Sequence, residues 1–254
     1  MTFRDFWTDE NNPSLPKSEY LYNLRHIIVL IITAVLAITL SIIFRKKSEK
    51  TKNTLFYILG SVFIFFETST RIINLIIAES YSLLSVLEII LPMHICSVMV
   101  WCLIFAIFLK KQFLINYSVI GGFIATLAFL LYPAVGLNKV YMTFTCIYST
   151  VSHSIGFVTS ILLMTLGKAK FEFKNIWQSY LCLIIMFIWG AILNFVIFPG
   201  ADYMYMINDP LELNLSFPYQ YLYSALLIVY TSIFYIIYTI IQKCKRKTKT
   251  DSKE

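Results

Sequence analysis

The sequence IIVLIITAVLAITLSIIFRKK, at residues 27–47, decides the fold class. Its first 18 residues carry no charge, and three basic residues follow them directly. A helix rises about 1.5 Å per residue and the hydrocarbon core of a bilayer is about 30 Å thick, so about 20 mostly apolar residues cross it. The stretch therefore predicts a membrane-spanning helix that ends in a basic, water-exposed segment.

Six further apolar stretches of similar length follow along the chain. Hydrophobic residues make up 58% of its 254 residues and charged residues only 14%, against about a quarter in soluble domains. We therefore predict an all-α fold, a polytopic bundle of about seven transmembrane helices in one integral membrane domain, residues 1–254. The predicted spans cover approximately residues 27–44, 54–78, 83–109, 112–132, 140–166, 176–198 and 218–241.

The distribution of lysine and arginine predicts the orientation, because these residues resist translocation. With the N-terminus outside, the cytosolic segments 45–53, 110–111, 167–175 and 242–254 hold 16 basic residues and the external segments hold 4. The basic tail 242–254 is then cytosolic, and the protein is a multi-pass protein of the cell membrane. The net charge of +7 thus reflects topology. We expect membrane lipids as partners and no nucleic acid, and the sequence does not fix the oligomeric state.

Two charged residues interrupt the second span. Glu67 and Arg71 lie four residues apart, on one face of a helix, where they can pair. A charge at the centre of a span costs about 2.5–3.5 kcal/mol on insertion scales, so we expect both side chains to be buried among other helices. Two interpretations are open: a structural ion pair that joins helices, and part of a substrate-binding site.

The third span holds the densest group of reactive residue types. Residues 88–96 read EIILPMHIC, which combines the carboxylate of Glu88, a proline, the imidazole of His94 and the thiol of Cys96 in one span. Pro92 removes a helical hydrogen bond and predicts a kink that can free carbonyl groups toward a cavity. On an ideal helix His94 and Cys96 point about 160° apart, so the two cannot be assumed to form a dyad.

His153, in the middle of the fifth span, is a better partner for Cys96. Both residues fall near the middle of the membrane, where adjacent helices could bring them together. A cysteine paired with a base is activated because the thiolate is the nucleophile. The alternative is that Cys96 packs as a small hydrophobe and His153 joins helices by hydrogen bonds.

A polar group also precedes the last span. Asn194 lies near the external end of the sixth span, and Asp202 and Tyr203 follow in a loop rich in aromatic residues. Tyrosines at this depth commonly form an interfacial belt. Asn194 falls in the outer half of the membrane with Arg71, Asn74 and Glu88, so we predict one polar pocket that opens outward or to the outer leaflet. Its predicted substrate-binding residues are Glu67, Arg71, Asn194, Asp202 and Tyr203.

Three segments resemble the YwaF-like integral membrane proteins, the group related to transmembrane protein 164. They are residues 88–96, the pair Ser152-His153, and residues 194–210, which contain Gly200-Ala-Asp202-Tyr203-Met. The resemblance covers most of the chain from the second span to the seventh. It departs at Asp202-Tyr203, where the family has Asn-Tyr, which puts a polar contact of that loop in doubt.

The resemblance implies a seven-span bundle and, for the animal relatives, a phospholipid acyltransferase role with a membrane cysteine as nucleophile. Carried to this sequence, it makes Cys96 the nucleophile and His153 a candidate base, with His94 and Glu88 nearby in the same catalytic group. A lipid hydrolase would use the same residues.

Two other classes of function stay open. Charges inside the membrane also suit a small-solute transporter or binding protein, and polar residues can simply lock a non-catalytic scaffold. The sequence has no Walker loop, HExxH, GxSxG or paired CxxC motif, so we expect no cofactor and no metal.

Overall fold

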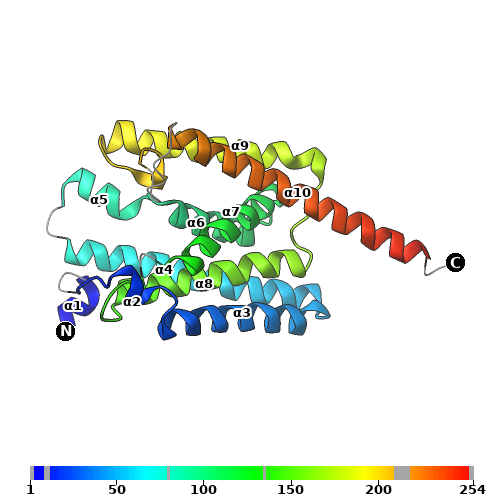
Figure 1. The fold of residues 1–254 in the computed structure, drawn as a ribbon, viewed down its shortest axis with the longest axis horizontal. Helices are drawn as coiled ribbons and strands as arrows, with labels where there is room; N and C mark the ends of the chain where they lie inside the picture. The colour runs from blue at the N-terminus through cyan, green and yellow to red at the C-terminus, as the bar shows by residue number, and fades with distance from the viewer. Residues whose placement is uncertain (1–2, 9–11, 79–80, 134–135, 209–217, 252–254) are drawn as a thin grey trace. The chain divides into compact units, whose positions relative to one another are not determined.

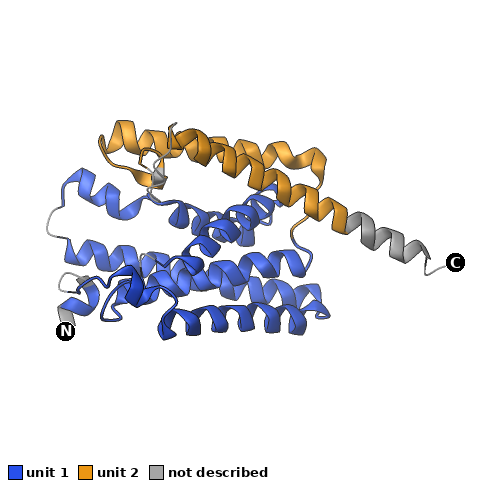
Figure 2. Cartoon of the chain, viewed as in Figure 1, with its two compact units in different colours: residues 1–168 blue, residues 169–254 orange. Residues whose placement is uncertain are grey.

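The computed structural model describes residues 3–8, 12–78, 81–133, 136–208 and 218–251. Every regular element in these ranges is helical, and one antiparallel bridge joins Ser14 to Lys139. The predicted all-α fold is therefore confirmed (Figure 1). The chain divides into two compact units, residues 1–168 and 169–254, and each is described by itself (Figure 2).

The first unit contains eight helices in its described residues. They are α1 (Phe3–Thr8), α2 (Lys17–Tyr20), α3 (Leu24–Arg45), α4 (Glu49–Ile77), α5 (Leu83–Ile90), α6 (Ile95–Leu109), α7 (Gln112–Leu131) and α8 (Phe144–Thr165).

The second unit is built mainly from two long helices. Its elements are η1 (Phe173–Asn175), α9 (Ile176–Ile192), the π-helical turn η2 (Leu193–Ile197), η3 (Tyr203–Tyr205) and α10 (Tyr219–Asp251).

The predicted number of membrane spans is confirmed. In the described ranges, six helices are each long and apolar enough to cross a bilayer, and α5 with α6 forms a seventh span if the bent pair is taken as one. The predicted boundaries differ from the observed ones by at most five residues. Which end of the bundle faces the cytosol stays a prediction from the charges.

The third span is where the structure departs from an ideal helix. Residues 91–94 leave the helix, and α5 and α6 are bent by 59° at this break. The predicted kink at Pro92 is thus a full interruption of the helix. The angle of about 160° between His94 and Cys96, which assumes one continuous helix, is wrong for this reason.

Helices α6, α7 and α8 form the buried centre of the first unit, with α3 packed on α8 and α4 packed on α6 and α8. Close packing depends on small residues, as is common between membrane helices. A Cβ atom at Gly156 of α8 would lie 2.7 Å from Thr126 Cγ2 of α7, and one at Gly122 would lie 2.9 Å from Ser160 Oγ. The two backbones therefore approach as closely as glycine allows.

Lysines at the ends of α6 and α8 contact the first part of α4. Lys168, after α8, binds the Glu49 carboxylate at the start of α4 at 2.7 Å and Asn53 at 2.6 Å. The ammonium group of Lys110, after α6, lies 5.0 Å from the ring centre of Tyr57 on α4. Three segments predicted to be cytosolic thus meet at one end of the first unit.

In the second unit, α9 packs against α10 through hydroxyl pairs. Ser179 and Tyr235 lie 2.9 Å apart, and Tyr180 and Ser232 lie 2.7 Å apart. The ring of Phe171 contacts three aromatic rings of α10 edge-on. Hydrogen bonds between apolar helices hold this pair where the lipid supplies no hydrophobic driving force.

Candidate functional site

Glu67 and Arg71 form the ion pair that was predicted in the second span. Glu67 lies on the buried face of α4 with Phe56, Gly60 and Phe63, and its side chain is 0% exposed. The guanidinium group of Arg71, one turn along the helix, pairs with the Glu67 carboxylate. Burial removes water from both charges, so the pair needs further hydrogen bonds to be stable.

Residues from two other helices supply these bonds. The hydroxyl of Tyr148 on α8 donates to Glu67 Oε1 at 2.5 Å, and Ser97 Oγ on α6 lies 3.4 Å from Glu67 Oε2. We call Glu67, Arg71, Ser97 and Tyr148 the Glu67 cluster. It joins α4, α6 and α8 at one level of the bundle.

Arg71 also spans the break in the third span. Its Nε donates to the Ile90 carbonyl of α5 at 2.9 Å, and its Nη2 donates to Ser97 Oγ of α6 at 3.2 Å. The Ile90 carbonyl is in the last turn of a helix, where no intrahelical donor reaches it. The guanidinium group further lies 5.6 Å from the ring centre of Trp101. One side chain therefore ties both sides of the break to α4.

Cys96 lies directly beside this cluster. It is in the first turn of α6, next to Ser97, and it is half-buried. His94 is the N-cap residue of α6 and makes no side-chain capping bond to it, and Glu88 is exposed on α5. The break thus brings the thiol close to a buried ion pair.

His153 is held by its neighbours on α7 and α8. Its ring stacks on Phe129 with centroids 3.8 Å apart, and Nδ1 lies 2.6 Å from the Ser149 carbonyl. A carbonyl only accepts, so Nδ1 carries the hydrogen and Nε2 has the free lone pair. Within the described residues, Nε2 is buried and has no hydrogen-bond partner.

The predicted hydrogen bond between Cys96 and His153 is therefore not formed. His153 lies five residues beyond Tyr148 on α8, a rise of about 7.5 Å. The ring of His153 reaches back to the Ser149 carbonyl, and its Nε2 makes no hydrogen bond to the Cys96 thiol or to any other group of the described residues. The structure places Cys96 next to Ser97 of the Glu67 cluster, and the catalytic pair with His153 stays a prediction.

The three site residues predicted near the last span belong to the second unit. The side-chain amide of Asn194, in η2, donates to the Tyr203 carbonyl at 3.0 Å and accepts from the Tyr203 amide at 2.8 Å. Asp202 accepts from the backbone amides of Ile207 and Asn208 at 2.8 and 2.9 Å. These side chains hold the loop in shape, and their role in substrate binding stays a prediction.

Comparison with known proteins agrees with this architecture. The model of the TMEM164 family matches residues 21–238. The chain belongs to the TMEM164 family. No curated protein and no solved structure matches it.

The match to the TMEM164 family includes every candidate residue of the site, from Glu67 to Tyr203. The sequence did not predict Ser97 or Tyr148 as residues of the site. A serine beside Cys96 and a tyrosine directly before the polar stretch of the fifth span were the available signals. Chemically, the first unit offers a thiol, a guanidinium group that can bind an anion, and an imidazole with a free lone pair.

Proposed function

We propose that this TMEM164-family protein is a phospholipid acyltransferase or lipid hydrolase of the cell membrane, with Cys96 as the acyl acceptor. The observation that carries the proposal is the position of the thiol at a broken membrane helix, next to the serine that Arg71 and Glu67 hold. A break of this kind exposes backbone groups that a continuous helix would cover. Reactive cysteines commonly lie beside a positive charge, and here Arg71 binds the residue next to Cys96.

The chemistry would proceed in two steps. Cys96 Sγ attacks the carbonyl carbon of an acyl ester, the thiol proton passes to His153 Nε2, and the carbon–oxygen bond to the glycerol oxygen breaks as that oxygen takes the proton. An acceptor hydroxyl, from a lysolipid or from water, then attacks the thioester and releases the thiol. Catalytic hydrogen bonds often form only with substrate bound, and a bridging water can shorten the path between Cys96 and His153.

Arg71 is the residue we assign to the anionic part of the substrate. Its guanidinium group is only partly exposed, so contact with a phosphate or a developing oxyanion would take place away from bulk water, where charge interactions are strong. In this role the Glu67 carboxylate and the Tyr148 hydroxyl position Arg71 and do not themselves react.

The test uses the purified full chain in phospholipid nanodiscs. Acyl transfer from a phospholipid with a labelled acyl chain to an added lysophospholipid is followed by liquid chromatography and mass spectrometry. Cys96→Ser should abolish transfer and hydrolysis, and Cys102→Ser, on the same helix, should leave both unchanged. The intact mass of the wild-type chain should show an acyl adduct that neutral hydroxylamine releases. Full activity in Cys96→Ser, or an adduct that persists in it, would end the proposal.

A non-catalytic scaffold is the second candidate, because every oxygen of the Glu67 carboxylate already has a partner within the protein. A scaffold predicts that substitutions in the Glu67 cluster lower only the amount of folded protein. A small-solute transporter predicts in contrast that Glu67, Arg71 and Glu88 are needed for uptake and that Cys96→Ala is tolerated.

A further inference from the structure

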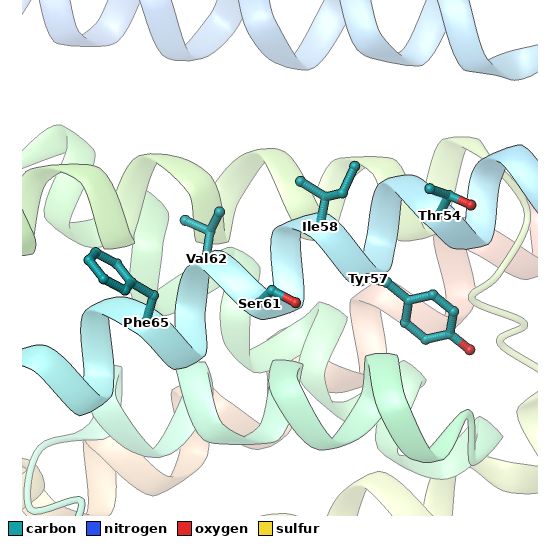
Figure 3. A pocket seen from close by; sticks show the side chains of 6 residues that line it. All are labelled: Thr54, Tyr57, Ile58, Ser61, Val62 and Phe65. Carbon is teal, nitrogen blue, oxygen red and sulfur yellow. The ribbon is translucent and has the colours of Figure 1, made fainter.

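The outer face of α4 carries a groove that the acyl-transfer proposal does not use. The groove is shallow and open, has a volume of about 410 Å³, and is lined by six residues of this one helix (Figure 3). Ile58 and Phe65 are 57% and 65% exposed, and Val62 lies between them. The opposite face of α4 holds Glu67 and the bundle core. The lining residues are Thr54, Tyr57, Ile58, Ser61, Val62 and Phe65.

The length of the groove matches one leaflet of a bilayer. The eleven residue steps from Thr54 to Phe65 rise about 16 Å, and half of a hydrocarbon core of about 30 Å is about 15 Å. Ile58, Val62 and Phe65 run along the groove with Ser61 between them, and Thr54 and Tyr57 lie at the end near the start of α4. The groove therefore has an apolar length and a polar mouth.

Positive charge surrounds this mouth. Lys110 is exposed, and its ammonium group lies 5.0 Å from the ring centre of Tyr57, which itself lines the groove. Lys50 lies one turn before Thr54 on α4, and Lys111 follows Lys110. Glu49, the acidic residue here, already binds Lys52 and Lys168. In the described part of the chain, no carboxylate lies within 4 Å of Lys110.

The backbone at Lys110 supports a specific role for its side chain. Lys110 ends α6 in the left-handed conformation, with φ 54° and ψ 25°. Glycine adopts this conformation without strain and is the usual residue there. The backbone at this position favours glycine over lysine, so what lysine adds is its charge beside Tyr57.

We propose that this face of α4 binds one anionic phospholipid, with an acyl chain along Ile58, Val62 and Phe65 and the headgroup phosphate at Lys110 and Tyr57. The occupant follows from the charge and the length: an apolar strip about one leaflet long, with an exposed lysine at its end, suits a lipid with a negative headgroup. The site is separate from Cys96 and does not depend on the acyl-transfer proposal. From the charge distribution, it lies in the cytosolic leaflet.

The experiment measures lipid binding to the detergent-purified full chain by native mass spectrometry. Phosphatidylglycerol and phosphatidylcholine with identical acyl chains are titrated separately. The wild type should bind its first phosphatidylglycerol about fivefold more tightly than phosphatidylcholine, the preference expected for one lysine near the headgroup. Lys110→Gly should remove the preference, and Tyr57→Leu should reduce it.

The controls distinguish lipid binding at this site from the effects of misfolding and from nonspecific electrostatic attraction of anionic lipid. Lys110→Gly relieves a strained backbone but removes the cation–π contact with Tyr57, so its melting temperature should stay close to that of the wild type. Lys47→Gln removes an exposed charge away from Tyr57 and should keep the preference, and Cys96→Ser should keep it too. Equal binding of both lipids to the wild type would overturn the proposal. An equal loss in Lys47→Gln and Lys110→Gly would also overturn it.

Discussion

Removing Arg71 while leaving Glu67 charged should be among the most damaging single changes in the first unit. Glu67 is 0% exposed and accepts from Arg71, Tyr148 and Ser97. In Arg71→Met the side chain keeps much of its apolar stem, but the carboxylate loses its counter-ion. Breaking a buried pair in this way costs about 3–5 kcal/mol. We expect a loss of that size in the free energy of unfolding.

The informative comparison is the double variant Glu67→Gln/Arg71→Met. Glutamine has nearly the shape of glutamate and its Oε1 still accepts from Tyr148, but it carries no charge. The Ile90 carbonyl loses the same donor in Arg71→Met alone and in the double variant, so that loss cancels between them. The double variant should therefore be more stable than Arg71→Met by about 2–4 kcal/mol, the buried-charge penalty less one ordinary hydrogen bond.

The assay is reversible unfolding of the purified chain in mixed micelles with increasing dodecyl sulfate, followed by tryptophan fluorescence. The four members of the cycle are wild type, each single variant and the double variant. If the double variant is as unstable as the sum of the two single variants, the two side chains do not interact in the folded membrane protein. An ion pair between Glu67 and Arg71 would then not be what holds α4 to the broken span.

Further substitutions test the Glu67 cluster and the contact between α7 and α8, with one control in the second unit. Tyr148→Phe removes a donor to a buried carboxylate and should cost about 1.5–3 kcal/mol in the same unfolding assay. Tyr230→Phe should be close to neutral, because in the described residues the buried Tyr230 hydroxyl has no partner; equal losses in both would contradict the hydrogen bond to Glu67. Gly156→Ala should destabilise by about 1–3 kcal/mol through contact with Thr126 Cγ2, although alanine favours helix. Thr126→Ser, which removes that methyl group, should restore stability, and no rescue would place the clash elsewhere.

The sequence predicted the spans well because the bilayer sets their length and because charges stop them. Residues 27–44 were expected and α3 runs over Leu24–Arg45, with Arg45 as its last residue. The ion pair of Glu67 and Arg71 was predictable for a related reason: two unlike charges one turn apart inside a span have few other stable arrangements. Both predictions depend on the cost of polar groups in hydrocarbon.

The partners of the pair were not predictable in the same way. Tyr148 is one of 17 tyrosines, and a tyrosine in a span is usually interfacial or packed, so nothing in the sequence marks it as the residue that binds Glu67. The depth of Cys96 was judged from a continuous third span. Because residues 91–94 leave the helix, that assumption does not hold, and His153 Nε2 has no hydrogen-bond partner among the described residues.

The break in the third span and the Glu67 cluster explain each other. A helix interrupted inside a membrane must find partners for its free backbone groups, and Arg71 provides one by donating to the Ile90 carbonyl. Arg71 can remain charged there because Glu67 pairs with it, and Glu67 is in turn held by Tyr148 and Ser97. Ser97 is the residue after Cys96, so the ion pair fixes the position of the thiol whether or not it takes part in chemistry. A structural role for the pair and a positioning role toward Cys96 are therefore the same set of contacts.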